Sequence, residues 1–197
     1  MTDTAQAIAA AAARWVVEEG LEYGPAKRRA ARELGWGSHS RMPDNQMLED
    51  SVREYLQIFA ADTQPKELQA LRQLALHWMR ELSEFRPHLT GAVWRGTATR
   101  LNDIHLQLYC DDPKSAEIEL INRGLDYQVG ATQGPKGQDV DVLSLSIPCP
   151  ELQEHVGLHL SVLDHDDLRG ALKPDAHGHS QRGDLKALEQ LMQSGPT

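Results

Sequence analysis

The spacing of apolar residues changes near Pro87, and this change does most to limit the folds open to the chain. Before Pro87, apolar residues recur three and four positions apart, as in the run from Leu68 to Leu82, which is typical of amphipathic helices. After Pro87, apolar and polar residues alternate, most clearly over 139–147 and 155–163. We therefore predict an α+β fold, in which an N-terminal helical region is followed by a mixed β-sheet with flanking helices.

The boundaries of the expected elements come from the same spacing and from turn and capping residues. Thr4 and either Asp44 or Asn45 are suited to cap helices, and Gly124 is suited to end one. We expect residues 1–86 to form a helical region packed on a core formed by residues 87–197. The expected helices are 4–19, 26–34, 45–59, 65–85, 113–124 and 183–192, with a helical turn over 164–172, and the expected strands are 89–94, 103–110, 125–129, 139–147 and 155–163.

Charge is spread unevenly along the 197 residues, whose formal net charge is −9. Residues 101–167 hold thirteen acidic and three basic side chains. Such a segment is poorly suited to grip a polynucleotide, because nucleic-acid affinity depends on neutralising phosphates, so nucleic acid is not a favoured partner. Two cysteines far apart in sequence favour reduced thiols and a cytoplasmic location, and no apolar run has the length that spans a membrane.

A glycine-containing stretch between two apolar runs carries the clearest functional signal. Gly91 follows an apolar run, Gly96 comes five positions later, and Asp103 opens the next apolar run twelve positions after Gly91. Glycine lets a backbone come close to a bound phosphate. Residues two apart on a strand face the same side, so Asp103 and His105 should project together.

This pattern resembles the signature of the DNA polymerase β-like nucleotidyltransferase superfamily, which reads Gly-Ser, a second glycine and then Asp-x-Asp. Two positions differ, because Ala92 replaces the serine and His105 replaces the second aspartate. The resemblance implies a divalent metal, Mg²⁺ or Mn²⁺, beside a nucleoside triphosphate, and transfer of a nucleotidyl group to an acceptor that the sequence does not identify. It also implies that the turn holds phosphate through Gly91, Ala92, Arg95, Gly96 and Thr97.

The family has a third carboxylate on a later strand, and Asp141 at the start of the alternating run 139–147 is the candidate here. Asp103, His105 and Asp141 are then the predicted catalytic and metal-binding residues. His105 has three interpretations: a ligand of a metal softer than Mg²⁺, a neutral hydrogen-bonding residue in a site that binds nucleotide without transferring it, or a structural histidine. The alternative function is therefore a catalytically silent fold that acts as a nucleotide sensor or protein-interaction module.

Weaker candidates lie outside this pattern. Arg100 could steady a phosphate, and His159 should share a face with Asp141 if the strands 139–147 and 155–163 form a hairpin. The basic run 27–32 could contact nucleic acid or an acidic partner, although a solvated helix face is the commoner role of such a run.

Overall fold

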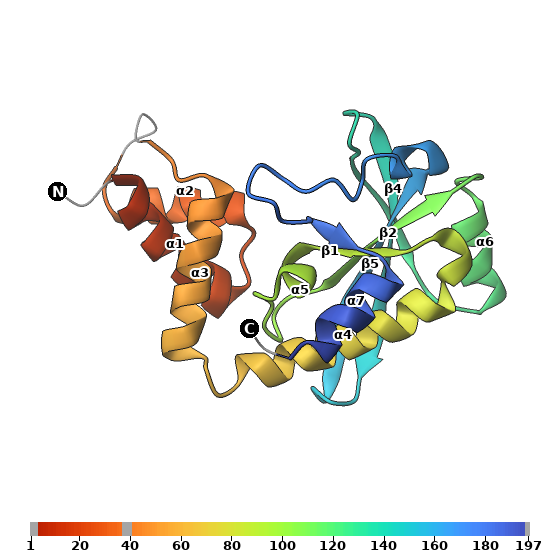
Figure 1. Ribbon diagram of the computed structural model, residues 1–197, viewed down its shortest axis with the longest axis horizontal. Coiled ribbons are helices and arrows are strands. Elements are labelled where there is room, and N and C mark those ends of the chain that lie inside the picture. The colour runs from red at the N-terminus through yellow and green to blue at the C-terminus, as the bar shows by residue number, and fades with distance from the viewer. Residues whose placement is uncertain (1–3, 37–40, 196–197) are drawn as a thin grey trace. The chain divides into compact units, whose positions relative to one another are not determined.

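The computed structural model describes residues 4–36 and 41–195, and the chain divides into two compact units, residues 1–66 and 67–197 (Figure 1). The sequence placed the boundary after residue 86 instead. The difference arises from helix α4 (Gln64–Glu81), which buries Leu71, Ala75 and Met79 in the core of the second unit. None of the helices in the described residues is both long enough and apolar enough to cross a membrane.

The first unit is a small three-helix assembly: α1 (Thr4–Glu19), α2 (Tyr23–Glu33) and α3 (Asn45–Phe59). The carboxylate of Asp44 accepts a hydrogen bond from the backbone N–H of Met47 at 2.8 Å, which caps α3 as expected. Alanines occupy much of the buried surface of α1 and α2, so the helices approach each other closely. The core of this unit consists of Ile8, Ala12, Ala13, Val16, Ala26, Ala30, Ala31, Leu48, Val52 and Leu56.

The second unit is a six-stranded mixed sheet with helices, and it confirms the predicted α+β class. The strands lie in the order β3-β4-β5-β2-β1-β6, in which β2 and β5 are parallel and the other neighbours are antiparallel. The strands are β1 (His88–Thr90), β2 (Ile104–Cys110), β3 (Gln128–Gln133), β4 (Asp139–Cys149), β5 (Glu154–Asp164) and β6 (Arg182–Gly183). The helical elements besides α4 are η1 (Ser83–Phe85), α5 (Gly91–Arg95), α6 (Ser115–Asn122), η2 (His165–Leu168) and α7 (Leu185–Gln193).

The two faces of the sheet differ in character. On one face, apolar residues at alternate strand positions pack with α4, α6 and α7 to form the main core (Figure 1). The core positions on the strands include Leu89, Leu106, Leu108, Leu143, Leu145, Leu158 and Leu160. The opposite face carries His105, His159 and Ser144, which are paired with one another across β2, β5 and β4. A polar surface therefore crosses the middle of the sheet on the side away from the main core.

Two strands end at places other than those expected. The strand predicted over 89–94 stops at Thr90, because Gly91 has φ +76° and turns the chain into the short helix α5. The strand predicted over 125–129 lies instead at 128–133, and its turn to β4 is closed by a hydrogen bond from the Gly134 N–H to the Gln138 carbonyl at 2.7 Å. The helical turn expected over 164–172 is confined to η2.

The far edge of the sheet is formed by β6, which joins β1 although the two strands are distant in sequence. Gly183 of β6 lies against the indole of Trp94, and a Cβ atom added to it would meet Trp94 Cη2 at 2.2 Å. The indole N–H also donates to the carbonyl of Ser180 at 2.8 Å. These contacts hold β6, and the start of α7 after it, against β1 and α5.

Candidate functional site

A chain of hydrogen bonds runs across three adjacent strands on the polar face. Asp103 lies immediately before β2 and accepts a hydrogen bond from Nε2 of His159 at 2.9 Å and from the backbone N–H of Gly157 at 3.1 Å. The other ring nitrogen of His159, Nδ1, lies 2.8 Å from Oγ of Ser144. Because the carboxylate can only accept, Nε2 carries a proton, and in the neutral ring the Ser144 hydroxyl donates to Nδ1. Both nitrogens of His159 are therefore occupied.

His105 completes this group from the neighbouring strand. Its ring stacks on that of His159, with the centroids 4.9 Å apart and the planes inclined by 23°. Gly91, at the start of α5, lies beside it, since a Cβ atom added to Gly91 would be 3.7 Å from Cδ2 of His105. The structure thus brings the first glycine of the predicted motif next to His105.

The hydrogen bonds of Asp103 also set its charge state. The pKa of Asp103 is lowered, chiefly by the hydrogen bond from His159, with a smaller contribution from the Gly157 N–H, while partial burial opposes the shift. The carboxylate is therefore ionised at neutral pH, and two of its acceptor directions are filled by donors from the chain itself.

Asp141 does not belong to this group, so the prediction that it shares a cleft with Asp103 is wrong. The hairpin of β4 and β5 pairs Ser144 with His159 and Val142 with Ser161, which turns Asp141 to the helix-covered face. Asp141 also lies opposite Val162, five residues beyond Gly157 along β5, a separation of about 16 Å.

The surroundings of Asp141 agree with this placement. The pKa of Lys114, just before α6, is raised mainly by its hydrogen bond to Glu117 and in smaller part by the charge of Asp141. The expectation that His159 and Asp141 share a face fails for the same reason, since the hairpin pairs even-numbered residues of β4 with odd-numbered residues of β5. The side chain of β5 that bonds the Asp103 carboxylate is His159.

The remaining turn residues are used largely by the fold itself. Gly96 ends α5 with φ +89°, and its N–H donates to the carbonyl of Ala92 at 2.9 Å. Thr97 is buried, and its hydroxyl has no hydrogen-bond partner within the described part of the chain. Arg95 is the last residue of α5. A left-handed glycine at each end of a five-residue helix is explained by the turn geometry alone.

The other basic candidates are engaged in contacts inside the chain. Arg100 bonds Glu154 at 3.3 Å and the carbonyl of Leu152 at 3.0 Å. In the basic helix α2, Nζ of Lys27 bonds the carbonyl of Pro43 at 2.8 Å, and the guanidinium of Arg29 lies 3.5 Å from the centre of the Trp15 ring. These partners give Lys27 and Arg29 structural roles.

The predicted metal site does not fit the side chains that the structure brings together. Mg²⁺ prefers oxygen ligands in octahedral geometry, whereas the groups gathered here are one carboxylate, already bonded to His159, and two imidazoles. Within residues 4–36 and 41–195, no three histidine, cysteine, aspartate or glutamate side chains are placed to share a metal ion.

Sequence reasoning identified Asp103 and His105 but missed the role of His159 and Ser144. The signal was present, because both lie on strands with clear alternation. Their partnership depended on whether β5 is parallel to β2 and on the register of the hairpin, neither of which alternation determines.

Comparison with known proteins adds little to this geometry. No family model matches the chain, and no curated protein matches it. Among solved structures, it is similar to the Cid1 poly(U) polymerase with MgGTP bound, at 18% sequence identity and a TM-score of 0.34. The match covers 49% of this chain and 32% of the polymerase. A likeness at this level says nothing about activity.

Proposed function

We propose that residues 67–197 form a nucleotide-binding module whose glycine and aspartate spacing resembles that of a nucleotidyltransferase core, but which lacks the paired-carboxylate metal site of that family. The observation that carries this proposal is the Asp103–His159–Ser144 hydrogen-bond chain, with His105 stacked on it beside Gly91. It supports the silent alternative, because the conserved chemistry of a two-metal transfer needs carboxylates free to hold cations.

The arrangement of the elements supports the nucleotide part of the proposal. The strand β1 leads through Gly91 into α5, β2 returns antiparallel to β1, and β5 lies parallel beside β2. Gly91 therefore follows one strand and Asp103 precedes the next, which is the placement that the spacing in the resembled family implies. The exposed ring of His105 also offers a flat surface on which a nucleobase can stack.

Titration calorimetry with the four ribonucleoside triphosphates tests the proposal. We expect binding in the presence of EDTA, with affinity changed less than about twofold when Mg²⁺ is added, because no cation site is needed. His105→Ala should weaken binding about tenfold, as expected for loss of one base-stacking contact. His165→Ala is the matched control, since His165 is an exposed histidine in η2 away from the site.

Two outcomes would overturn the proposal. The first is the absence of binding for every nucleotide at millimolar concentration. The second is robust Mg²⁺-dependent transfer of a labelled nucleotide by the wild-type protein, which would require a metal site that these residues do not form.

A gain-of-function variant examines the missing metal site directly. His159 pairs with His105 on the parallel neighbour strand and bonds Asp103, so His105→Asp combined with His159→Asp places three carboxylates together. We expect this double variant to bind Mg²⁺ at least about tenfold more tightly than the wild type, because oxygen ligands replace imidazoles. His105→Asp with Asp141→Asn should bind Mg²⁺ as tightly as His105→Asp alone, since Asp141 lies on the other face.

A further inference from the structure

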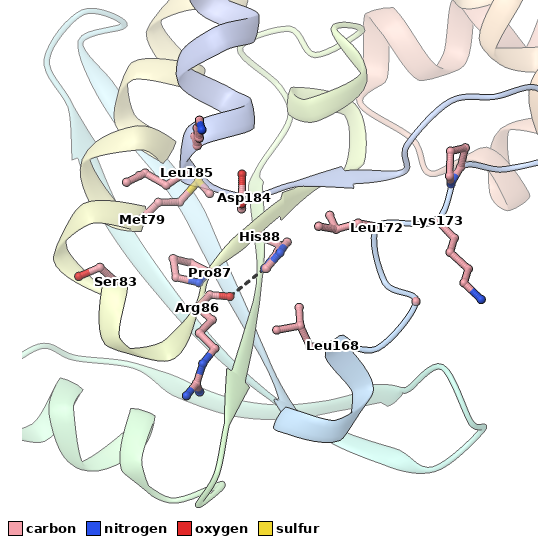
Figure 2. Close-up of a pocket in the computed structure, with 13 residues that line it drawn as sticks. Met79, Ser83, Arg86, Pro87, His88, Leu168, Leu172, Lys173, Asp184 and Leu185 are labelled. Carbon is pink, nitrogen blue, oxygen red and sulfur yellow. Dashed lines mark hydrogen bonds between the residues drawn. The ribbon is translucent and has the colours of Figure 1, made fainter.

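A second candidate site lies beside β1 and the start of α7, and its lining includes none of Asp103, His105, Ser144 and His159. It is a cavity of about 880 Å³ whose walls are mainly apolar (Figure 2). The walls come from α4, the segment after η2 and the first turn of α7. Their apolar side chains are those of Met79, Pro87, Leu168, Leu172 and Leu185.

His88 is a polar residue in the lining of this mainly apolar cavity. The residue is 4% exposed and lines the cavity. Its Nδ1 lies 2.8 Å from the carbonyl of Arg86, and because a carbonyl only accepts, Nδ1 carries the proton. The pKa of His88 is lowered, chiefly by burial, so the ring is neutral at pH 7 and Nε2 holds a lone pair.

This lone pair has no hydrogen-bond partner among the residues that the structure describes. Figure 2 shows the ring of His88 with one nitrogen joined to Arg86 and the other side of the ring directed toward Leu172. An edge-on contact with Tyr109, with centroids 5.1 Å apart, holds the ring in place. Because His88 lines the cavity, this acceptor is open to a ligand that supplies the donor.

The charged residues around the cavity do not favour an ionic ligand. The guanidinium of Arg86 points away from the cavity in Figure 2 and bonds the carbonyl of Tyr109 at 3.1 Å. Lys173 also extends outward. The carboxylate of Asp184 caps α7 by accepting from the Ala187 N–H at 2.9 Å. Ser83 and Lys186 also line the cavity, whose surface is nevertheless mainly apolar.

We propose that this cavity binds a small uncharged molecule with an apolar body, which donates one O–H or N–H hydrogen bond to Nε2 of His88. The proposal is independent of nucleotide binding, because the cavity lining includes none of Asp103, His105, Ser144 and His159.

Indole and N-methylindole are suitable probes, because they share an apolar body and only indole has an N–H donor. We expect indole to bind the full chain about fivefold more tightly than N-methylindole, as one net hydrogen bond predicts. The side-chain ¹⁵N resonance of Nε2 should shift on addition of indole and shift less with N-methylindole. Both measurements use the wild-type protein and do not depend on any variant.

Variants test whether the preference for indole over N-methylindole depends on His88. His88→Phe keeps a planar ring against Tyr109 but removes the acceptor, so indole and N-methylindole should then bind equally. If that variant does not fold, His88→Asn serves the same purpose, because its amide nitrogen takes the place of Nδ1 and nothing replaces Nε2. His159→Phe is the matched control and should keep the fivefold preference. Equal affinity of the two probes for the wild type, or no binding of indole at millimolar concentration, would overturn the proposal.

Discussion

His159 and His88 lie on the same face of the sheet, but the more exposed of the two makes more hydrogen bonds within the chain. The side chain of His159 is 26% exposed, yet both of its nitrogens have partners in the chain. His88 is 4% exposed, and only Nδ1 has a partner among the described residues. The two hydrogen bonds of His159 stabilise the fold without any ligand. The acceptor of His88 without a partner in the chain is open to a ligand in the cavity that His88 lines.

The largest change should come from Gly157→Ala. A Cβ atom at this position would lie 2.5 Å from Cγ of Asp103, so the carboxylate must move and its bonds to His159 and to the Gly157 N–H are disturbed. We expect a loss of about 1–3 kcal/mol in the free energy of unfolding, measured with urea. Gly130→Ala is the control in the same sheet, since its nearest atom is at an ordinary 3.9 Å. Equal stability of the two variants would show that Asp103 is not held as described.

A pair of histidine substitutions compares the two regions directly. His159→Phe removes two hydrogen bonds and leaves Asp103 with one donor fewer, so we expect a loss of about 2 kcal/mol in unfolding free energy. His88→Phe removes one hydrogen bond but also the unpaired acceptor, and should cost less than about 1 kcal/mol. Urea unfolding of both variants at pH 7 measures the difference. A larger loss for His88→Phe would reverse the comparison.

Ser144→Ala should have a smaller effect than His159→Phe. It removes only the hydroxyl that bonds Nδ1, and the nitrogen can reach solvent in the partly exposed site. We expect a loss of about 0.5–1 kcal/mol, again from urea unfolding. Ser146→Ala, an exposed position on the same strand and face, is the control and should leave stability unchanged. A loss as large as that of His159→Phe would mean that Ser144 fixes the ring by itself.

The smallest effect should be the pH dependence of Asp103→Asn. The folded-state pKa of Asp103 lies below its ordinary value of 3.8, so its ionised form stabilises the fold above that pH. This contribution is lost as pH falls through the folded-state pKa. Because the side chain is 47% exposed, we expect a difference of only about 0.5–1 kcal/mol between wild type and variant at pH 6. The difference should shrink below pH 4 (about the ordinary Asp pKa), and a constant difference down to pH 3 (well below that value) would contradict the assignment.

The fold class was predictable because it depends on local spacing. The alternation over 139–147 and 155–163 identifies strands wherever they pair, and the helical spacing before Pro87 identifies helices. The chain also turns at Gly91, which lies beside His105. These features depend on neighbouring residues in the chain and need no knowledge of distant contacts.

The site was only partly predictable, because its members meet through strand register. The sequence predicted Asp141 as the neighbour of Asp103, whereas the side chain that bonds Asp103 is that of His159. A shift of one residue in the β4–β5 hairpin exchanges the faces of all side chains on a strand, and alternation by itself does not fix that shift. The cavity at His88 was not foreseen either, since it is formed by α4, the segment after η2 and α7, which the sequence alone does not bring together.

The pairing of β6 with β1 has a consequence for the order of folding. Leu89 pairs with Gly183, so this edge can form only after more than ninety residues of chain have been closed into a loop. The hairpin of β4 and β5 closes over a handful of residues and should form much earlier. Trp94 then packs against β6 and the start of α7 late in folding. Pulse-labelling hydrogen exchange should therefore find the amides of α7 protected after those of β4, with the cavity at His88 assembled last.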